Sequence, residues 1–230
     1  MRFRLTEKFL RENGIFDEIT AERFEKYFDL VSEANSKFNL TAITDTEGFD
    51  SKHFYDSLAA YEYVKNARSV CDMGSGAGFP GIPLAIVCPD VSFTLVDSLK
   101  KRTDFLDACI KELGLSNCKA VHARAEEHAS SHREEYDACT SRAVAPLNTL
   151  AELCAPLIKK GGLFLAYKGK NAHEEEVAAK NAYDILGLRK KEEFVYECAG
   201  EKRFILVGEK ISSTPVRYPR GGNKPRTRPI

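Results

Sequence analysis

The spacing of apolar positions along the chain changes near residue 69, from helical intervals to short runs that alternate with amphipathic stretches. Before that point the apolar residues recur at helical intervals. Phe24, Tyr27, Phe28 and Val31 are three or four residues apart and share one face of a helix. We expect this aromatic stripe to pack against the rest of the protein. The predicted helices are one around Leu5–Arg11, one carrying the stripe with Thr20 as its cap, and one over His53–Tyr63.

From residue 69 onward, short apolar runs alternate with amphipathic stretches. Alternating strands and helices predict an α/β, Rossmann-like fold, whose parallel sheet is covered on both faces. A turn at residues 199–201 adds a terminal hairpin, so the expected sheet has seven strands and is mostly parallel. The predicted strands are Ser69–Met73, Ser92–Asp97, Lys119–His122, Tyr136–Ser141, Leu163–Tyr167, about Arg189–Cys198 and Arg203–Lys210; the predicted helices between them are Ile82–Val87, Lys100–Leu113, Leu147–Ile158 and Glu174–Leu186.

This pattern divides the chain into three expected parts. Residues 1–65 form a helical extension, which we call the N-terminal cover, and residues 66–211 form the α/β domain. Residues 212–230 form a basic C-terminal tail, which holds five cations and no acid. Prolines and glycines interrupt the tail, so we expect neither a helix nor a central strand there. The cations are Arg217, Arg220, Lys224, Arg226 and Arg228.

The glycine loop, residues 74–81, follows the first strand and carries the most chemical information. Gly76, Gly78 and Gly81 satisfy G-x-G-x-x-G, and Asp97 ends the next strand about 20 residues on, which is a weak dinucleotide signal when taken alone. Asp72 separates the alternatives, because a diphosphate disfavours a nearby carboxylate whereas the ammonium group of S-adenosylmethionine favours one. Asp97 would then accept hydrogen bonds from the ribose. The pattern therefore predicts a class I S-adenosylmethionine-dependent methyltransferase, although a carboxylate that only fastens the loop is an alternative.

The segment after the third predicted strand supports the same cofactor. Ala125 and Glu126 lie where methyltransferases of this class recognise adenine, through a backbone N–H and an acidic side chain. Acids at this point also suit the first turn of a helix.

The end of the fourth predicted strand bears on the acceptor atom. The prolines typical of amine methyltransferases are missing, and Cys139 and Cys154 are expected in the core, so neither serves as a nucleophile. Arg142 is the charged group that remains, and we expect it to be the catalytic residue. A site without a base suits an acceptor with a free lone pair, such as guanine N7, and catalysis by alignment.

The composition excludes several classes of protein and kinds of site. Lys plus Arg and Asp plus Glu both number 34, which argues against a histone-like wrapper. The seven cysteines form no CxxC pair, so we expect buried thiols, no metal centre and a reducing compartment. The N-terminus has no signal peptide, and no apolar run could cross a membrane. We expect a cytoplasmic protein.

Taken together, these motifs resemble the bacterial RsmG family, also called GidB, from Asn39 to the end of the chain. The resemblance implies methylation of guanine N7 in 16S ribosomal RNA, with the RNA or the small ribosomal subunit as partner. We expect a monomer. The resemblance also implies cofactor contacts at Gly74, Phe79, Ala125, Glu126 and Arg142. The matching residues are Asn39–Thr41, His53 with Asp56–Leu58, Gly74–Leu84, Asp97 with Lys100–Arg102, Phe105–Leu106, Arg124–Glu127, Ser141–Ala143, Lys168–Gly169 and Tyr218–Arg220.

Cations and one histidine are candidates for RNA contact. His53 could stack on a base or belong only to the cover, and the basic turn that begins at Lys100 could be merely solvated. A flexible tail could follow a phosphate backbone, or Tyr218–Pro219 could pack back on the domain. Two rival functions remain open: a nicotinamide-dependent oxidoreductase and a non-catalytic rRNA-binding assembly protein. The RNA-binding candidates are His53, Lys100, Arg102, Arg124, Lys168 and Arg220.

Overall fold

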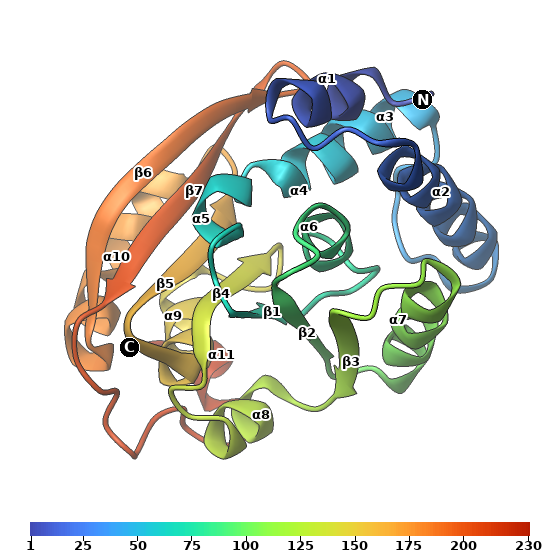
Figure 1. The fold of residues 1–230 in the computed structure, drawn as a ribbon. Coiled ribbons are helices and arrows are strands. Elements are labelled where there is room, and N and C mark those ends of the chain that lie inside the picture. Colours follow the sequence, from blue (N-terminus) through green and yellow to red (C-terminus); the bar gives the residue numbers. More distant parts are fainter.

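A seven-stranded sheet organises the molecule (Figure 1). The computed structural model describes residues 1–230, apart from the side chain of Phe38. The strand order is β3-β2-β1-β4-β5-β7-β6. Strands β1 to β5 are parallel, and β7 runs antiparallel to both of its neighbours. The predicted fold class is confirmed. The strands are β1 (Ser69–Met73), β2 (Ser92–Asp97), β3 (Cys118–His122), β4 (Tyr136–Arg142), β5 (Ile158–Lys168), β6 (Leu188–Cys198) and β7 (Glu201–Lys210).

Helices cover both faces of the sheet, and the side chains of each strand alternate between the two resulting cores. Val70 and Ala138 belong to the core shared with the N-terminal cover, whereas Cys71 and Cys139 belong to the core beneath α8, α9 and α10. The helices of the α/β domain are α6 (Gly81–Val87), α7 (Lys100–Glu112), α8 (Ala125–Ser131), α9 (Leu147–Cys154) and α10 (Ala172–Leu186).

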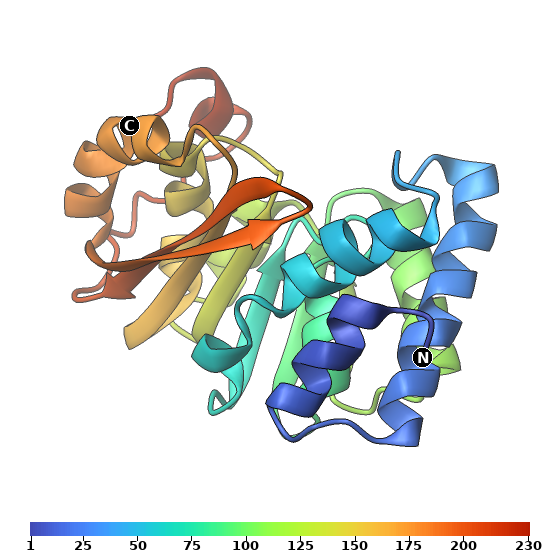
Figure 2. The same ribbon diagram turned by 90° about the horizontal axis from the view of Figure 1, so that it is seen from above.

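The N-terminal cover packs on the α6 and α7 side of the sheet (Figure 2). The aromatic stripe of α2 is buried as predicted: Phe24, Tyr27 and Val31 are 0% exposed. Burying a phenylalanine side chain contributes about 1.5–3 kcal/mol, so this packing holds the cover in place. The cover comprises α1 (Arg4–Glu12), α2 (Glu18–Phe38), α3 (Thr46–Gly48), the π-helix η1 (Phe49–Tyr55), α4 (Asp56–Leu58) and α5 (Tyr61–Val64).

Two local predictions were wrong. The N-cap of α2 is Asp17, whose side chain accepts a hydrogen bond from the Thr20 backbone N–H, because Thr20 already lies within the first turn. The helix expected over Leu147–Ile158 ends at Cys154, and a short 3-10 turn, η2 (Ala155–Leu157), leads into β5. Strand β5 therefore begins at Ile158 and includes Gly161 and Gly162, whereas the predicted strand began after this glycine pair, at Leu163.

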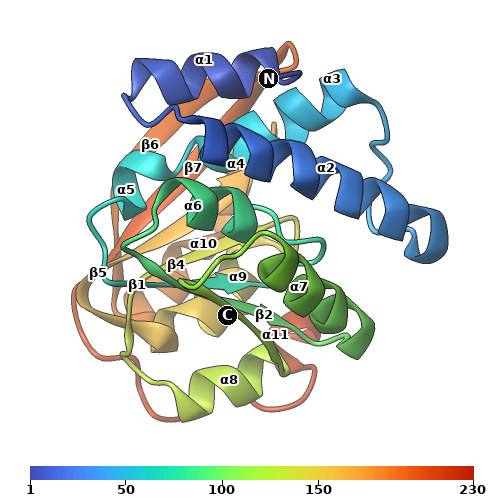
Figure 3. The ribbon, with the colours of Figure 1, turned by 45° about the vertical axis from the view of Figure 1, so that its right-hand side comes forward.

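The C-terminal tail is docked on the domain, and its predicted lack of helix was also wrong. A short helix, α11 (Lys224–Thr227), lies beside α9 (Figures 1 and 3). Pro225 occupies the first turn of this helix, where the missing backbone donor costs nothing. Tyr218 is buried in the α8–α10 core, which agrees with the alternative that the tail packs back.

The topology gathers the predicted functional segments at one edge. The chain order reverses between β1 and β4, which lie side by side with Asp72 paired to Thr140. In such sheets the crevice for a ligand forms where the order reverses, at the carboxyl ends of the strands. Among the described residues, no helix is long and apolar enough to span a bilayer.

Candidate active site at the carboxyl ends of the strands

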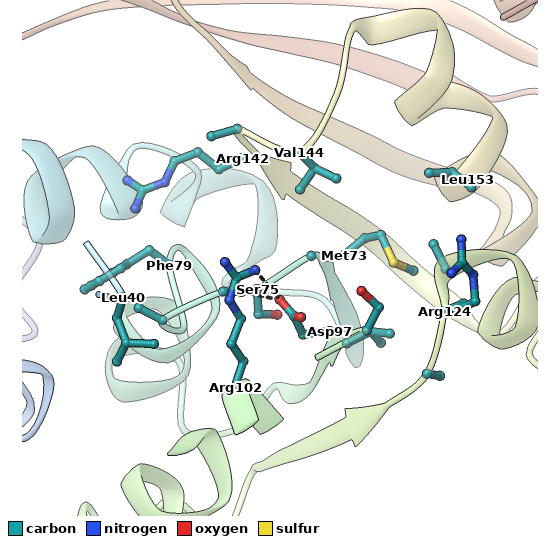
Figure 4. A pocket seen from close by; sticks show the side chains of 18 of the residues that line it. Leu40, Met73, Ser75, Phe79, Asp97, Arg102, Arg124, Arg142, Val144 and Leu153 are labelled. Atoms are coloured by element: carbon teal, nitrogen blue, oxygen red, sulfur yellow. Dashed lines mark hydrogen bonds and ion pairs between the residues drawn. The ribbon is translucent and has the colours of Figure 1, made fainter. Parts of the chain in front are cut away.

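A cavity of about 430 Å³ lies at the carboxyl ends of β1 to β4. The size suits a small-molecule ligand. Figure 4 shows Arg142, Phe79 and Leu40 toward one end, Arg124 and Leu153 toward the other, and Asp97 with Arg102 between them. The predicted site residues that line this cavity are His53, Gly74, Gly76, Phe79, Asp97, Arg102, Arg124, Ala125, Glu126 and Arg142.

The glycine loop forms the floor of the cavity, and its glycines have different tasks. Gly74 has φ +75°, and a Cβ there would stand 2.4 Å from Val144 Cγ2. Gly76 has φ +60° and nothing within 4 Å of a Cβ position, so the backbone there is open to a ligand. Gly78 does not line the cavity; a Cβ on it would stand 2.6 Å from the hydroxyl of Tyr27 in the cover. Gly78 therefore serves the packing of the cover.

Asp97, at the end of β2, is tied to the loop and still faces the cavity. One carboxylate oxygen accepts from Gly76 N (3.0 Å) and the other from Leu99 N (2.9 Å). The guanidinium of Arg102 lies 3.4 Å from the first oxygen, as the dashed line in Figure 4 marks. Asp97 is only 4% exposed, so these contacts fix its carboxylate at the cavity wall.

Asp72 lies beneath the loop and not in the cavity. It is 1% exposed, accepts from the Thr140 hydroxyl (2.9 Å) and from Gly81 N (3.2 Å), and does not line the cavity. Burial raises the pKa of this carboxyl to about 6. In this structure Asp72 fastens the glycine loop, which was the alternative to a direct cofactor contact.

The other end of the cavity is built by the first turn of α8. Arg124 N donates to the Glu127 carboxylate (3.4 Å), which caps the helix, whereas Glu126 lines the cavity. Of these two adjacent acids, the resemblance implied a cofactor contact for Glu126, and Glu126 is the one that lines the cavity. Leu153 of α9 and Arg226 of the tail also line the cavity, and neither was predicted as a cofactor contact.

Arg142 stands where the α/β domain meets the cover. It donates to Asp56 Oδ2 (2.6 Å) and to Lys52 O (3.1 Å), and its guanidinium lies 5.3 Å from the centre of the Phe79 ring. Three elements of the site are therefore linked through one side chain, since Phe79 belongs to the glycine loop and Asp56 to the cover.

His53 is part of this junction. Its ring stacks on Phe79 with centroids 4.4 Å apart, and its Nε2 lies 2.8 Å from the Thr41 hydroxyl. Burial, with the charge of Arg142, lowers the pKa of His53 to about 3, so the ring is neutral at physiological pH. The π-helix η1 places it here, and Leu40 and Thr41 beside it are lining residues that periodicity alone does not reveal.

A second cavity of about 370 Å³ adjoins the first and shares Arg142, Ala143 and Val144 with it. Lys168 donates to Glu175 (2.6 Å) and to Ala145 O (2.8 Å), and the Tyr196 hydroxyl donates to Asp56 (2.8 Å). Arg203 also lines this cavity, and its buried Nε has no hydrogen-bond partner among the described residues. Of the residues that line this cavity, only Arg142 and Lys168 were predicted as site residues, because Tyr196 and Arg203 come from the antiparallel hairpin.

The cysteines are buried free thiols, as predicted. Cys139 and Cys154 are 0% exposed, and burial raises the pKa of the Cys139 thiol. Neither lines a cavity described above, so the site offers no thiolate nucleophile from these two residues.

Two of the predicted RNA-binding cations lie outside both cavities. Lys100 pairs with Asp104 on the surface of α7. Arg220 forms an ion pair with Glu152, a residue that is 0% exposed (2.6 Å).

A family model described as rRNA small subunit methyltransferase G matches residues 20–206. The chain is 46% identical over 228 residues to the ribosomal RNA small subunit methyltransferase G of Lysinibacillus sphaericus, with 96% of each chain covered. It is 47% identical over 231 residues to the protein of the same name from Desulfitobacterium hafniense, with 99% of this chain and 95% of that one covered.

Solved structures show the same fold at low identity. M. jannaschii TYW2 in complex with AdoMet aligns with a TM-score of 0.56 at 16% identity, over 68% of this chain and 74% of that one. The Methanococcus jannaschii fibrillarin pre-rRNA processing protein aligns with a TM-score of 0.53 at 16% identity, over 65% and 70% of the two chains.

Proposed function

The chain belongs to the rRNA small subunit methyltransferase G family, and we propose that it transfers a methyl group from S-adenosylmethionine to N7 of a guanine in 16S ribosomal RNA. The observation that carries this proposal is the pair of adjoining cavities that share the end of β4. A methyl transfer needs a donor and an acceptor held in contact, and two cavities that meet at Arg142 provide that arrangement.

The first cavity fits the donor. Gly76 leaves open space for the cofactor to approach the backbone, Asp97 offers a carboxylate at the end of β2 for ribose hydroxyls, and Glu126 offers one for the exocyclic amine of adenine. S-adenosylmethionine supplies an electrophilic methyl group on a sulfonium.

The second cavity fits a guanine. Asp56 and Glu175 can accept from the N1–H and the 2-amino group of the base, and the guanidinium of Arg203, which also lines this cavity, can donate to its carbonyl oxygen. N7 carries a lone pair, so no proton has to be removed before methyl transfer. The absence of a thiolate from Cys139 or Cys154 is consistent with an acceptor that attacks directly.

Arg142 is the catalytic residue in this proposal. Its position between the cavities lets it contact the base while Asp56 and Lys52 O hold its guanidinium. Catalysis then depends on alignment in a site shielded from water. Asp72 takes part by fixing the loop, since Gly81 and Thr140 already occupy its carboxylate.

The surrounding cations form the proposed contact with RNA phosphates. Arg102 and Arg124 are 38% and 56% exposed at the cavity wall, and Lys100 is exposed nearby, so a backbone can reach them. His53, Lys168 and Arg220 are each engaged inside the protein, and we assign them to shaping the surface that the RNA meets.

We also propose the oligomeric state and the compartment in which this reaction takes place. The protein acts as a monomer in the cytoplasm on 16S rRNA or on the small ribosomal subunit, without a metal ion. Within the chain, residues 66–211 supply most of the wall of the cofactor cavity, residues 1–65 form the cover, and residues 212–230 form the tail.

The experiment uses radiolabelled S-adenosylmethionine with three substrates that lack the modification: naked 16S rRNA, a subunit assembly intermediate and the mature small subunit. Label should enter at least one of them, and borohydride–aniline treatment should then cleave at the modified guanine. The Arg142→Ala variant should transfer no label above background. Label without aniline cleavage would contradict N7 as the acceptor, and binding of NAD in place of S-adenosylmethionine by calorimetry would support the oxidoreductase.

A further inference from the structure

The C-terminal tail is fastened along its length by polar contacts to groups inside the domain. The guanidinium of Arg133 donates to Thr214 O and Tyr218 O, both at 2.6 Å. Lys210, which is fully buried, donates to Ala155 O and to the Thr214 hydroxyl. These contacts hold the first half of the tail against the domain.

The second half of the tail is attached to α9. The carboxylate of Glu152 accepts from Arg220 at three nitrogens: backbone N (2.8 Å), Nε (2.8 Å) and Nη2 (2.6 Å). Glu152 is 0% exposed with the tail in place, so loss of the Arg220 side chain would leave this carboxylate without its cation. Thr149, one turn earlier on α9, donates its hydroxyl to Pro225 O (2.9 Å).

These two attachments place α11 at the wall of the first cavity. Leu153, next to Glu152 on α9, lines that cavity, and so does Arg226, next to Pro225 on α11. Figure 4 shows Leu153 and Arg124 at the same end of the cavity, the end that the first turn of α8 builds. The tail therefore adds a cation to the wall of the cavity, carried by a helix that packs beside α9 and its Leu153.

We propose that the docked tail completes the cofactor site, with the guanidinium of Arg226 closing over the adenosine end of the cofactor. This inference rests on the proposed function, because it takes the first cavity to hold S-adenosylmethionine. A planar guanidinium suits this task, since it stacks on aromatic faces such as that of adenine. Arg220 acts indirectly. Its ion pair with Glu152 positions α11, and Arg220 itself lines neither cavity.

The test measures S-adenosylhomocysteine binding by calorimetry on the full-length protein and on single variants. Arg226→Ala should raise the dissociation constant about 3- to 10-fold, the order expected for loss of one stacking cation. Arg228→Ala is the matched control, because it removes the same charge two residues along from an exposed position outside the cavity. It should leave the dissociation constant unchanged.

Arg220→Ala and truncation after Ser213 extend the test to docking. Both should weaken S-adenosylhomocysteine binding at least as much as Arg226→Ala, although neither Arg220 nor most of the removed residues line the cavity. Melting temperatures and circular dichroism identify any variant that fails to fold, and Arg226→Ala, an exposed substitution, keeps the test valid in that case.

The outcomes separate this inference from the proposed function. If the intact protein does not bind S-adenosylhomocysteine, the cofactor assignment and this inference both fall. If the intact protein binds it and the Arg226→Ala and Arg228→Ala variants bind it equally well, only this inference is overturned. Unchanged cofactor binding with weaker RNA binding in Arg226→Ala would also overturn it, and would assign the tail to the RNA.

Discussion

The N-terminal cover and the C-terminal tail reach the same cavity by different physical means. The cover supplies Leu40, Thr41 and His53 to its wall, and the tail supplies Arg226. Aromatic packing holds the cover, since Phe54 contacts Phe3, Phe24 and Phe79 among other rings. The tail is held by hydrogen bonds and one ion pair to buried groups.

This difference sets how each attachment fails. Apolar packing is spread over many contacts and has no preferred direction, so its strength follows the area removed from water. Besides the burial of Tyr218, the tail depends on a few directional contacts, and breaking those made to Glu152 or Thr149 leaves a buried polar group without that partner. We therefore expect a graded loss when the cover is altered and an abrupt release when the tail is altered.

The largest expected effect lies in the cover. Phe54→Ala should lower the free energy of unfolding by about 3–5 kcal/mol, because it removes a fully buried ring and leaves a cavity. Urea unfolding measures this loss. Ile19→Ala, on a side chain that is 63% exposed in α2, should change the stability by less than about 0.5 kcal/mol. A small loss for Phe54→Ala would show that the cover does not depend on its aromatic core.

The tail should respond to the loss of one charge. Arg220→Ala should lower the free energy of unfolding by about 3 kcal/mol, the lower end of the range for breaking a buried pair, because Arg220 is a quarter exposed. Replacing both partners, as in Glu152→Leu with Arg220→Leu, should recover part of that loss in the same urea measurement. If the double variant is as unstable as the single one, the uncompensated charge of Glu152 is not the cause.

The same contrast explains what the sequence could predict of the fold. Periodic apolar residues identified the strands of the parallel sheet and the helices of the cover, because their burial is visible in local spacing. The start of β5 was missed because the apolar residues from Leu147 to Ile158 also suit a helix, and the turn between α9 and β5 has no glycine. The docking of the tail was left open because Arg220 and its partner Glu152 are 68 residues apart.

The residues of the candidate site also divide into those that the sequence could predict and those that it could not. The glycine loop, Asp97, Glu126 and Arg142 were placed together because the carboxyl ends of parallel strands meet at one edge. Tyr196 and Arg203 were missed because they reach the second cavity from an antiparallel hairpin, whose register local sequence does not reveal. The exposure of Asp72 depends on how Thr140 and Gly81 surround it, which the motif alone does not contain.

Arg142 tests the polar link between cover and domain. Arg142→Lys keeps the charge but replaces the planar guanidinium, whose Nη1 donates to both Asp56 and Lys52 O, by a shorter ammonium group. We expect kcat for methyl transfer to fall about 100-fold, equivalent to about 2.7 kcal/mol, with a smaller change in KM. Arg189→Lys, on the exposed face of β6, is the matched control and should keep full activity. An unchanged kcat for Arg142→Lys would remove this residue from the chemistry.

The smallest expected effect is the change of stability with pH that arises from His53, the buried ring of the cover that faces Arg142. The pKa of His53 is lowered to about 3 in the folded protein against an ordinary value of 6.5, so below pH 6.5 the unfolded chain binds more protons and the folded state loses stability. Between pH 7 and pH 5.5 this loss amounts to about 1 kcal/mol. Asp72 opposes it, because its pKa is raised to about 6 and protonation between that value and 3.8 favours the folded state.

The comparison that isolates His53 is therefore the difference between the native protein and His53→Gln, measured by urea unfolding at both pH values. His53→Gln should gain stability relative to the native protein as the pH falls, and equal slopes for the two proteins would contradict a neutral, buried His53.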